Sequence, residues 1–193
     1  MRARRASSIL LALLLPALAA CSGGLEGTGD ANYVSGDGAI VAVAPADREA
    51  PVEISGETLD GDRIDLADLR GQVVVLNLWG SWCTPCRAEA PVLRTAAEEV
   101  DAAFVGMSFR ETSFENARAF EREFDIGYPT IADTGDGALR LGKYAPVSPP
   151  TTYILDPQGR VAALITEEVT SAATIEGLVE DVAADTPADD GSS

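Results

Sequence analysis

The residues of this chain best suited to chemistry are two cysteines, Cys83 and Cys86, in the sequence Trp-Cys-Thr-Pro-Cys-Arg. An apolar run over residues 73–79 predicts a buried strand before them, and a helical pattern of apolar residues follows. Cys83 is therefore expected at a helix N-terminus, where the helix dipole and the unpaired N–H groups favour a thiolate. Two thiols on one helical turn can close a disulfide and reopen it. The spacing predicts a redox-active dithiol.

The cysteine and histidine content argues against other uses of this pair. The chain has three cysteines and no histidine. A zinc site of four Cys or His ligands, a c-type haem site and a hydrolase with a histidine base each need residues that are missing. An inert structural disulfide is the alternative, but a bridge between such near neighbours restricts the unfolded chain very little. We expect no metal and no cofactor.

The N-terminus predicts export. Arginines at positions 2, 4 and 5 precede an apolar segment, residues 9–18, that is too short to span a bilayer comfortably. The segment ends in Leu-Ala-Ala-Cys, which resembles a bacterial lipoprotein signal. We expect residues 1–20 to be a signal peptide and Cys21 to carry lipid such as palmitate; an ordinary secretory signal is the alternative. The protein would then be anchored at the extracytoplasmic face of the cell membrane.

The rest of the chain divides into a tether, one domain and a tail. Residues 21–48 begin with Cys21 and are rich in Gly, Ala, Asp and Ser, which predicts a flexible tether with a reach of roughly 30 Å. Residues 49–186 have the size of one domain, and residues 187–193 predict a disordered tail. The net charge of -17 argues against nucleic acid as a partner, because nucleic-acid binding needs a basic surface.

Hydrophobic patterns predict an α/β domain with a mixed sheet flanked by helices. The Asp60-Gly61 turn signal predicts an early hairpin between strands at residues 52–54 and 63–66. Further strands are expected at residues 73–79, 103–107, 151–155 and 161–165. Helices are expected from Cys83 to about Val100 with a kink at Pro91, over residues 113–124 with Ser113 as the cap, over residues 136–143, and from Ser171 onward.

Several separated segments resemble the bacterial membrane-tethered thiol:disulfide oxidoreductases of the TlpA/ResA/CcmG group, in the AhpC/TSA superfamily. The segments are residues 56–69, 77–87, 106–111 and 147–161. The most specific motif is Cys-x-Pro-Cys after a tryptophan, with Pro-Thr-Thr downstream. The resemblance implies a thioredoxin-like fold with an N-terminal β-hairpin extension.

The resemblance also implies a role for each site residue. Cys83 matches the exposed nucleophile, and Cys86 matches the buried resolving thiol. Pro150 matches a cis-proline beside the dithiol, with an ordinary trans loop at Pro149-Pro150 as the alternative. The expected substrate groove comprises Trp82, Thr84, Pro85, Pro149 and Thr151.

Two features depart from the thioredoxin pattern, one at Asn77 with Glu111 and one at Pro149. Asn77 stands where thioredoxin has an aspartate below the dithiol, and an amide cannot exchange protons. Glu111 occupies the place of a glutamate in the ResA-like subgroup, so we expect it near Cys86, with a raised pKa and a role in proton transfer. A solvated loop acid is the alternative for Glu111. Pro149 lacks the backbone N–H that thioredoxin folds offer to a bound peptide.

Taken with this resemblance, the sequence predicts a monomeric, lipid-anchored enzyme that reduces disulfides in exported client proteins. The resemblance implies apocytochrome c as the client, during cytochrome c maturation, and a membrane electron donor that re-reduces the dithiol. A thiol oxidant or isomerase is one alternative. A non-catalytic metal chaperone or binding lipoprotein is another, although a copper-delivery protein would be expected to supply a histidine ligand.

Overall fold

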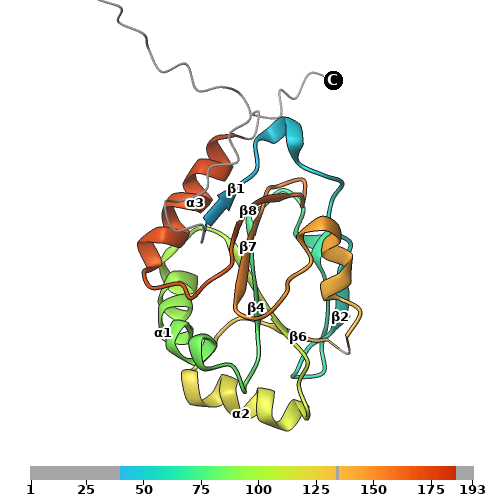
Figure 1. The fold of residues 1–193 in the computed structure, drawn as a ribbon, viewed down its shortest axis with the longest axis vertical. Coiled ribbons are helices and arrows are strands. Elements are labelled where there is room, and N and C mark those ends of the chain that lie inside the picture. Colours follow the sequence, from blue (N-terminus) through green and yellow to red (C-terminus); the bar gives the residue numbers. More distant parts are fainter. Residues whose placement is uncertain (1–39, 134, 186–193) are drawn as a thin grey trace, which may run out of the picture.

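A computed structural model describes residues 40–133 and 135–185, and its core is a six-stranded sheet in the order β1-β8-β7-β4-β5-β6 (Figure 1). β4 pairs in parallel with β5, and β5 with β6, whereas the β4–β7, β7–β8 and β1–β8 pairs are antiparallel. The predicted mixed sheet is therefore confirmed. The strands are β1 Ile40–Ala42, β4 Val74–Trp79, β5 Ala103–Ser108, β6 Thr130–Ala132, β7 Thr151–Leu155 and β8 Val161–Ile165.

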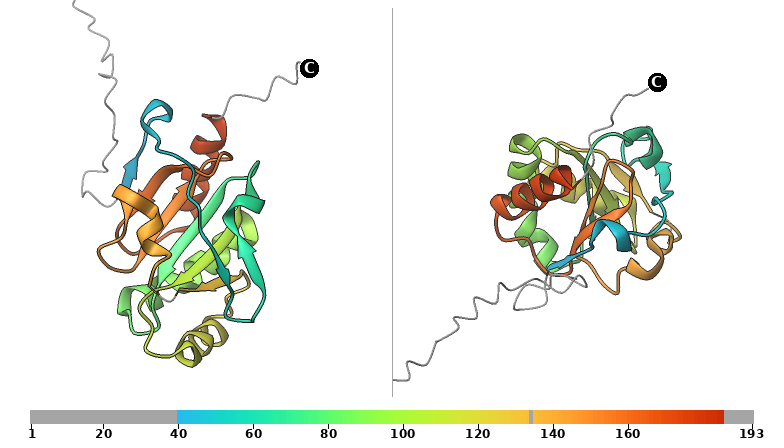
Figure 2. Two further views of the ribbon diagram at one scale, coloured as in Figure 1. Left: turned by 90° about the vertical axis from the view of Figure 1, so that its right-hand side faces the viewer. Right: turned by 90° about the horizontal axis from the view of Figure 1, so that it is seen from above.

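Two helices, α1 (Thr84–Glu99) and α3 (Ala172–Ala184), cover one face of the sheet (Figure 2). Leu93 of α1 and Ile175 of α3 pack there against Val75 of β4. A third helix, α2 (Phe114–Phe124), packs near the end of β4, where the ring of Phe120 stacks on Trp79. The helices agree with the sequence pattern, and Ser113 caps α2 by accepting the Glu115 N–H.

The other face is covered by the hairpin β2 (Ser55–Glu57) and β3 (Arg63–Asp65) and by two 3₁₀ helices, Leu66–Leu69 and Ala138–Tyr144. Both faces of β4 are therefore covered, and all of its residues are buried. This double burial explains why the strand is a continuous apolar run rather than an alternating one. The predicted N-terminal hairpin is present in the structure.

The structure differs from the sequence expectation at three places. The first hairpin strand begins at Ser55, and Val52 before it bonds elsewhere, because its backbone N–H donates to the Gly159 carbonyl at 2.8 Å. The short strand β6 was not expected, since three residues give no measurable period. Pro91 lies within α1, and the kink expected there stays a prediction. A short 3₁₀ helix, Pro45–Asp47, lies in the expected tether.

The fold also begins earlier than residue 49. β1 pairs with β8, so Ile40 to Ala42 belong to the sheet. The buried side chain of Arg48 donates to the Val43 carbonyl and to Asp156 and Asp185, which ties this segment to the β7–β8 turn and to the end of α3. The sequence showed too little periodicity here to predict a strand. The expected signal peptide, Cys21 and the tail lie outside the described residues.

Among residues 40–133 and 135–185, no helix is both long enough and apolar enough to cross a membrane.

Candidate active site

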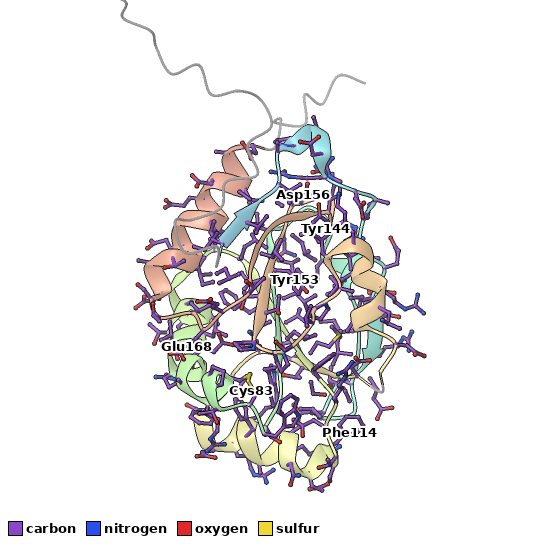
Figure 3. All side chains as sticks on the ribbon, viewed as in Figure 1. Cys83, Phe114, Tyr144, Tyr153, Asp156 and Glu168 are labelled. Atoms are coloured by element: carbon purple, nitrogen blue, oxygen red, sulfur yellow. A yellow bond between two sulfur atoms is a disulfide. The ribbon has the colours of Figure 1, made fainter. Side chains whose placement is uncertain are left out.

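Cys83 and Cys86 form a disulfide at the start of α1, with their Cα atoms 5.3 Å apart (Figure 3). β4 ends at Trp79, and a short turn follows in which the Cys83 N–H donates to the Gly80 carbonyl. Cys83 is the N-cap of α1, and its sulfur accepts the backbone N–H of Cys86 at 3.2 Å. A thiolate at Cys83 would therefore face a backbone donor and the positive end of the helix. This geometry favours ionisation of Cys83 over Cys86.

Both cysteines are largely covered in the disulfide form. Cys83 exposes 4% of its surface and Cys86 exposes 1%. Trp79, Ala90 and Phe120 belong to the same apolar cluster as the pair. The expectation of an exposed Cys83 is therefore not met in the disulfide form, because the apolar cluster at the start of α1 buries both sulfur-bearing residues.

The Pro149–Pro150 peptide bond is cis, the geometry that we predicted for it. It directly precedes β7, where Thr151 lies opposite Leu78 of β4. The Thr151 hydroxyl donates to the Ser148 carbonyl at 3.0 Å across the proline pair. Because Cys83 follows the same end of β4, the two prolines and the disulfide lie at one end of the sheet.

The expected groove residues differ in accessibility. Trp82, Thr84 and Pro85 are exposed, whereas Pro149 and Thr151 are buried. The Trp82 side chain is 54% exposed, and its indole N–H donates to the Phe109 carbonyl at 3.3 Å. Trp82 therefore has a fixed ring at the surface beside Cys83. The role of these residues in substrate binding stays a prediction.

Glu111 lies in the loop after β5 and is half-buried. Its carboxylate accepts the backbone N–H of Ser81 at 2.5 Å and the Ser81 hydroxyl at 2.8 Å. Glu111 therefore holds the turn two residues before Cys83. Proton transfer by Glu111 stays a prediction, and these contacts give the side chain a structural role as well.

A second carboxylate, Glu89, was not singled out from the sequence. It lies on α1 three residues after Cys86 and is 1% exposed. One oxygen accepts the Asn77 amide at 2.9 Å, and the other accepts the Val169 N–H at 3.0 Å. Burial raises the pKa of Glu89 to about 7, an effect that Glu168 reinforces and the two hydrogen bonds oppose. This carboxyl can gain or lose a proton near neutral pH.

The signal for Glu89 is present in the helical pattern. Cys86, Glu89, Ala90 and Leu93 are all buried and fall on one side of α1, because residues three or four apart share a helix face. A charged residue within an apolar stripe is unusual, since glutamate is seldom fully buried without partners. Those partners come from β4 and the β8–α3 loop, which are distant in sequence.

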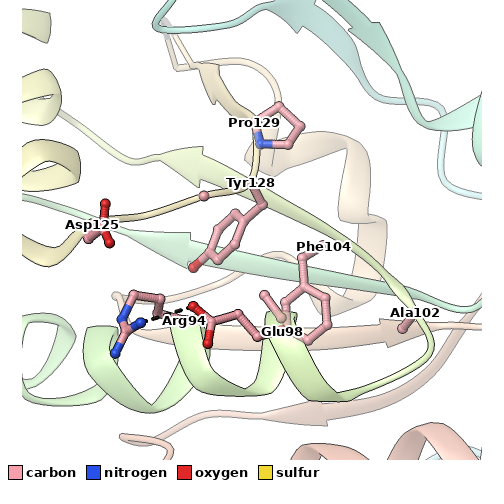
Figure 4. A pocket seen from close by; sticks show the side chains of 9 residues that line it. Arg94, Glu98, Ala102, Phe104, Asp125, Tyr128 and Pro129 are labelled. Atoms are coloured by element: carbon pink, nitrogen blue, oxygen red, sulfur yellow. Dashed lines mark hydrogen bonds and ion pairs between the residues drawn. The ribbon is translucent and has the colours of Figure 1, made fainter.

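A separate cavity of about 320 Å³ lies between α1 and the segment before β6 (Figure 4). Its lining includes the Arg94–Glu98 ion pair, Phe104, Tyr128 and Asp125. No residue of the dithiol site contributes to it. The described residues also contain no group of three or more Cys, His, Asp or Glu side chains placed to hold a metal ion.

Comparisons with known proteins agree with this geometry. A model described as the AhpC/TSA family matches residues 46–164. The chain is 32% identical over 121 residues to "Thiol-disulfide oxidoreductase ResA" of Bacillus subtilis (strain 168), covering 59% of this chain and 64% of that protein. It is 30% identical over 138 residues to a ResA of Bacillus cereus, covering 70% of this chain and 77% of that protein. The match to the Bacillus subtilis protein thus spans slightly less than two thirds of that relative's length.

Solved structures show the same fold. A secreted thiol-disulfide isomerase from Corynebacterium glutamicum superposes with a TM-score of 0.67 at 35% identity, covering 76% of this chain and 95% of that chain. A DsbF homologue from Corynebacterium diphtheriae gives a TM-score of 0.69 at 33% identity, with the same coverage. The fold and the disulfide at the start of α1 are those of thioredoxin-like thiol:disulfide oxidoreductases. The chain belongs to the AhpC/TSA family.

Proposed function

We propose that this protein is a thiol:disulfide oxidoreductase that reduces disulfides in client proteins. The observation that supports this most directly is the Cys83–Cys86 disulfide at the N-terminus of α1, beside the exposed residues Trp82, Thr84 and Pro85. The buried carboxyl of Glu89 on the same face of α1 adds a group that can accept a proton near neutral pH. Relatives named thiol-disulfide oxidoreductase support thiol–disulfide exchange as the chemistry, and the direction toward reduction is the proposal.

The reaction is a thiol–disulfide exchange in two steps. In the reduced protein, the Cys83 thiolate attacks one sulfur of a client disulfide. The client S–S bond breaks, a mixed disulfide forms, and the other client sulfur leaves as a thiolate that takes up a proton. Cys86 then loses its proton and attacks the Cys83 sulfur. The mixed disulfide breaks, the second client thiol leaves, and the Cys83–Cys86 disulfide remains with two electrons transferred to the client.

Glu89 acts in the second step as the acceptor of the Cys86 proton. An ordinary glutamate is ionised at neutral pH and is too weak a base for this task, whereas a pKa of about 7 matches it. Asn77 positions the carboxyl and also donates to the Thr152 hydroxyl at 3.0 Å. Asn77 is thus a positioning residue.

The protein works at the extracytoplasmic face of the membrane, held there by lipid on Cys21. Its clients are exported proteins, with apocytochrome c as the first to test, and a membrane donor with a reactive dithiol restores the reduced form. The support is the Leu-Ala-Ala-Cys signal and the family resemblance. In a membrane fraction, Cys21→Ala should release the protein or leave the signal uncleaved. A wild-type N-terminus without lipid mass would overturn the anchor.

Disulfide isomerisation is a second candidate function. The solved neighbour from Corynebacterium glutamicum is described as a secreted thiol-disulfide isomerase. Two assays separate the two functions. A reductase reduces insulin disulfides stoichiometrically in a Cys83-dependent reaction, whereas an isomerase restores activity to scrambled ribonuclease without net transfer of electrons. If wild type and Cys83→Ser reduced insulin equally, the proposed reductase function would be rejected.

A further inference from the structure

A groove of about 370 Å³ lies under the segment that joins the 3₁₀ helix Ala138–Tyr144 to β7. Its apolar lining comes from β1, β7, β8 and that segment, with Tyr144 and Tyr153 visible in Figure 3. The Tyr153 hydroxyl donates to the Tyr144 carbonyl at 2.8 Å and so fixes both walls relative to each other. The principal apolar lining residues are Val41, Tyr144, Val147, Tyr153 and Leu164.

The groove is chemically distinct from the rest of the surface. The chain has 31 acidic residues, yet none of the described residues that line the groove is acidic. Lys143 is its single charged residue, and its ammonium group is paired with Glu49. Val147 at the rim is 93% exposed, an unusual placement for a valine beside an apolar depression. The lining is therefore suited to bind an apolar side chain.

The groove is continuous with the dithiol end of the sheet. Ser148 and Thr151 line it, and these two residues flank the Pro149–Pro150 bond. Thr151 also lies opposite Leu78, shortly before the turn that leads to Cys83. β4, which leads to Cys83, and β8, which carries the lining residue Leu164, are two strands apart in the sheet, a lateral separation of roughly 10 Å or about three residues of an extended chain.

We propose that this groove binds the client chain next to its reactive disulfide and selects clients with a bulky apolar side chain about three residues from the attacked cysteine. This inference depends on the proposed reductase function, because the occupant is the client of that reaction. The cysteine would lie at Cys83, the chain would pass the proline pair, and the apolar side chain would enter between Val147 and Leu164.

The test compares two synthetic peptides with the full-length reduced protein. Each peptide has one intramolecular disulfide, and they differ only by Phe or Ser three residues from the first cysteine. Hydroxyethyl disulfide, which is too small to reach the groove, serves as the reference substrate. We expect wild type to favour the Phe peptide by about tenfold in kcat/KM, the scale of one apolar contact.

Two variants block the groove by different means, one by charge and one by volume. Val147→Asp places a charge at the rim, and Thr166→Trp fills the groove from an exposed lining position. Both should abolish the preference for the Phe peptide. Leu139→Asp is the matched control, because Leu139 is also an exposed apolar residue, at 69%, but does not line the groove. It should keep the wild-type preference.

Each remaining outcome overturns the proposal in a recognisable way. A wild type without preference, or a preference that survives both groove variants, shows that clients do not use the groove. Loss of the preference in Leu139→Asp assigns the effect to surface charge. Tyr33 is an aromatic residue seven positions before β1 in the sequence. If Tyr33→Ser accelerates both peptides, the segment of this chain that precedes β1 is the occupant. Failure to reduce hydroxyethyl disulfide and both peptides rejects the reductase function itself.

Discussion

The side-chain amide of Asn77 on β4 donates to the carboxylate of Glu89 on α1 at 2.9 Å. Asn77 occupies the strand position at which thioredoxin has an aspartate. In this protein the carboxyl group of the same region belongs to Glu89 on the helix. Glu89 is buried and follows Cys86 by almost one helical turn. The arrangement supplies a titratable carboxyl on the dithiol helix, and Asn77 and Val169 hold it in place.

Glu89 should make the stability of the oxidised protein depend on pH. Its pKa is about 7 in the folded state against an ordinary value of 4.5, so the folded state holds more protons than the unfolded state between these values. The free energy of unfolding should therefore fall as pH rises from 4.5 to 7, by up to about 3 kcal/mol. Urea unfolding of wild type and Glu89→Gln across pH 5 to 8 measures the difference. An identical pH slope in both proteins would contradict a raised pKa.

Glu89→Gln should also change thiol reactivity. Removing the proton acceptor should slow attack by Cys86 and shift the pH profile of alkylation, because coupled groups titrate together. Glu99→Gln is the matched control, since it makes the same change at an exposed position on α1. Alkylation rates of the reduced proteins between pH 5 and 10 give the profiles. If Glu111→Gln shifts the profile and Glu89→Gln does not, the sequence-based assignment of Glu111 holds and the proton role of Glu89 is rejected.

The two cysteines should react differently in the reduced protein. The Cys83 pKa should lie below the roughly 8.5 of a free cysteine, because its sulfur accepts the Cys86 N–H at the helix N-terminus. Iodoacetamide should label Cys83 much faster than Cys86 at neutral pH. Cys86→Ala should accumulate mixed disulfides with clients, and Cys83→Ala should not. Equal labelling, or trapping only by Cys83→Ala, would reverse the roles.

Arg48 should anchor the segment that leads into the fold. Its buried guanidinium contacts Asp156, which is fully buried, and Asp185. Arg48→Ala should lower the free energy of unfolding by about 3 kcal/mol, because it leaves a buried carboxylate with one ion-pair partner fewer. Arg94→Ala, which breaks an ion pair on a more exposed surface, should cost about 1 kcal/mol or less. Similar losses in both variants would show that residues 40–48 contribute little to the domain.

The sequence predicted the structure best around Cys83, where the reactive residues lie between two segments with clear hydrophobic patterns. The run before Cys83 and the stripe on α1 predict the strand, the helix and the dithiol between them, because both faces of β4 and one face of α1 are buried. The cis geometry of the Pro149–Pro150 bond was predicted from the family resemblance and not from the local sequence pattern. β1 and β6 are too short to show a period, and their pairing partners are set by tertiary contacts.

The choice of a proton-transferring carboxylate also shows that sequence patterns do not reveal long-range contacts. Glu111 was selected by its place after β5, but its carboxylate binds Ser81. Glu89 lies one turn before Leu93 on the buried face of α1, a position that the predicted apolar face of the helix did not include. Its hydrogen bonds to Asn77 and Val169 join residues 12 and 80 positions apart in sequence. Burial by segments distant in the sequence raises the pKa of Glu89 toward neutrality, these hydrogen bonds oppose the rise, and a local sequence pattern encodes neither effect.

The reduction potential of the Cys83–Cys86 pair tests the central claim most directly. Equilibration of the full-length protein with glutathione or dithiothreitol buffers, read out by alkylation of free thiols, gives its value. A reductant of client disulfides should have a potential near that of thioredoxin, about -270 mV. A value near -120 mV, typical of a strong oxidant, would contradict the proposed direction of electron flow.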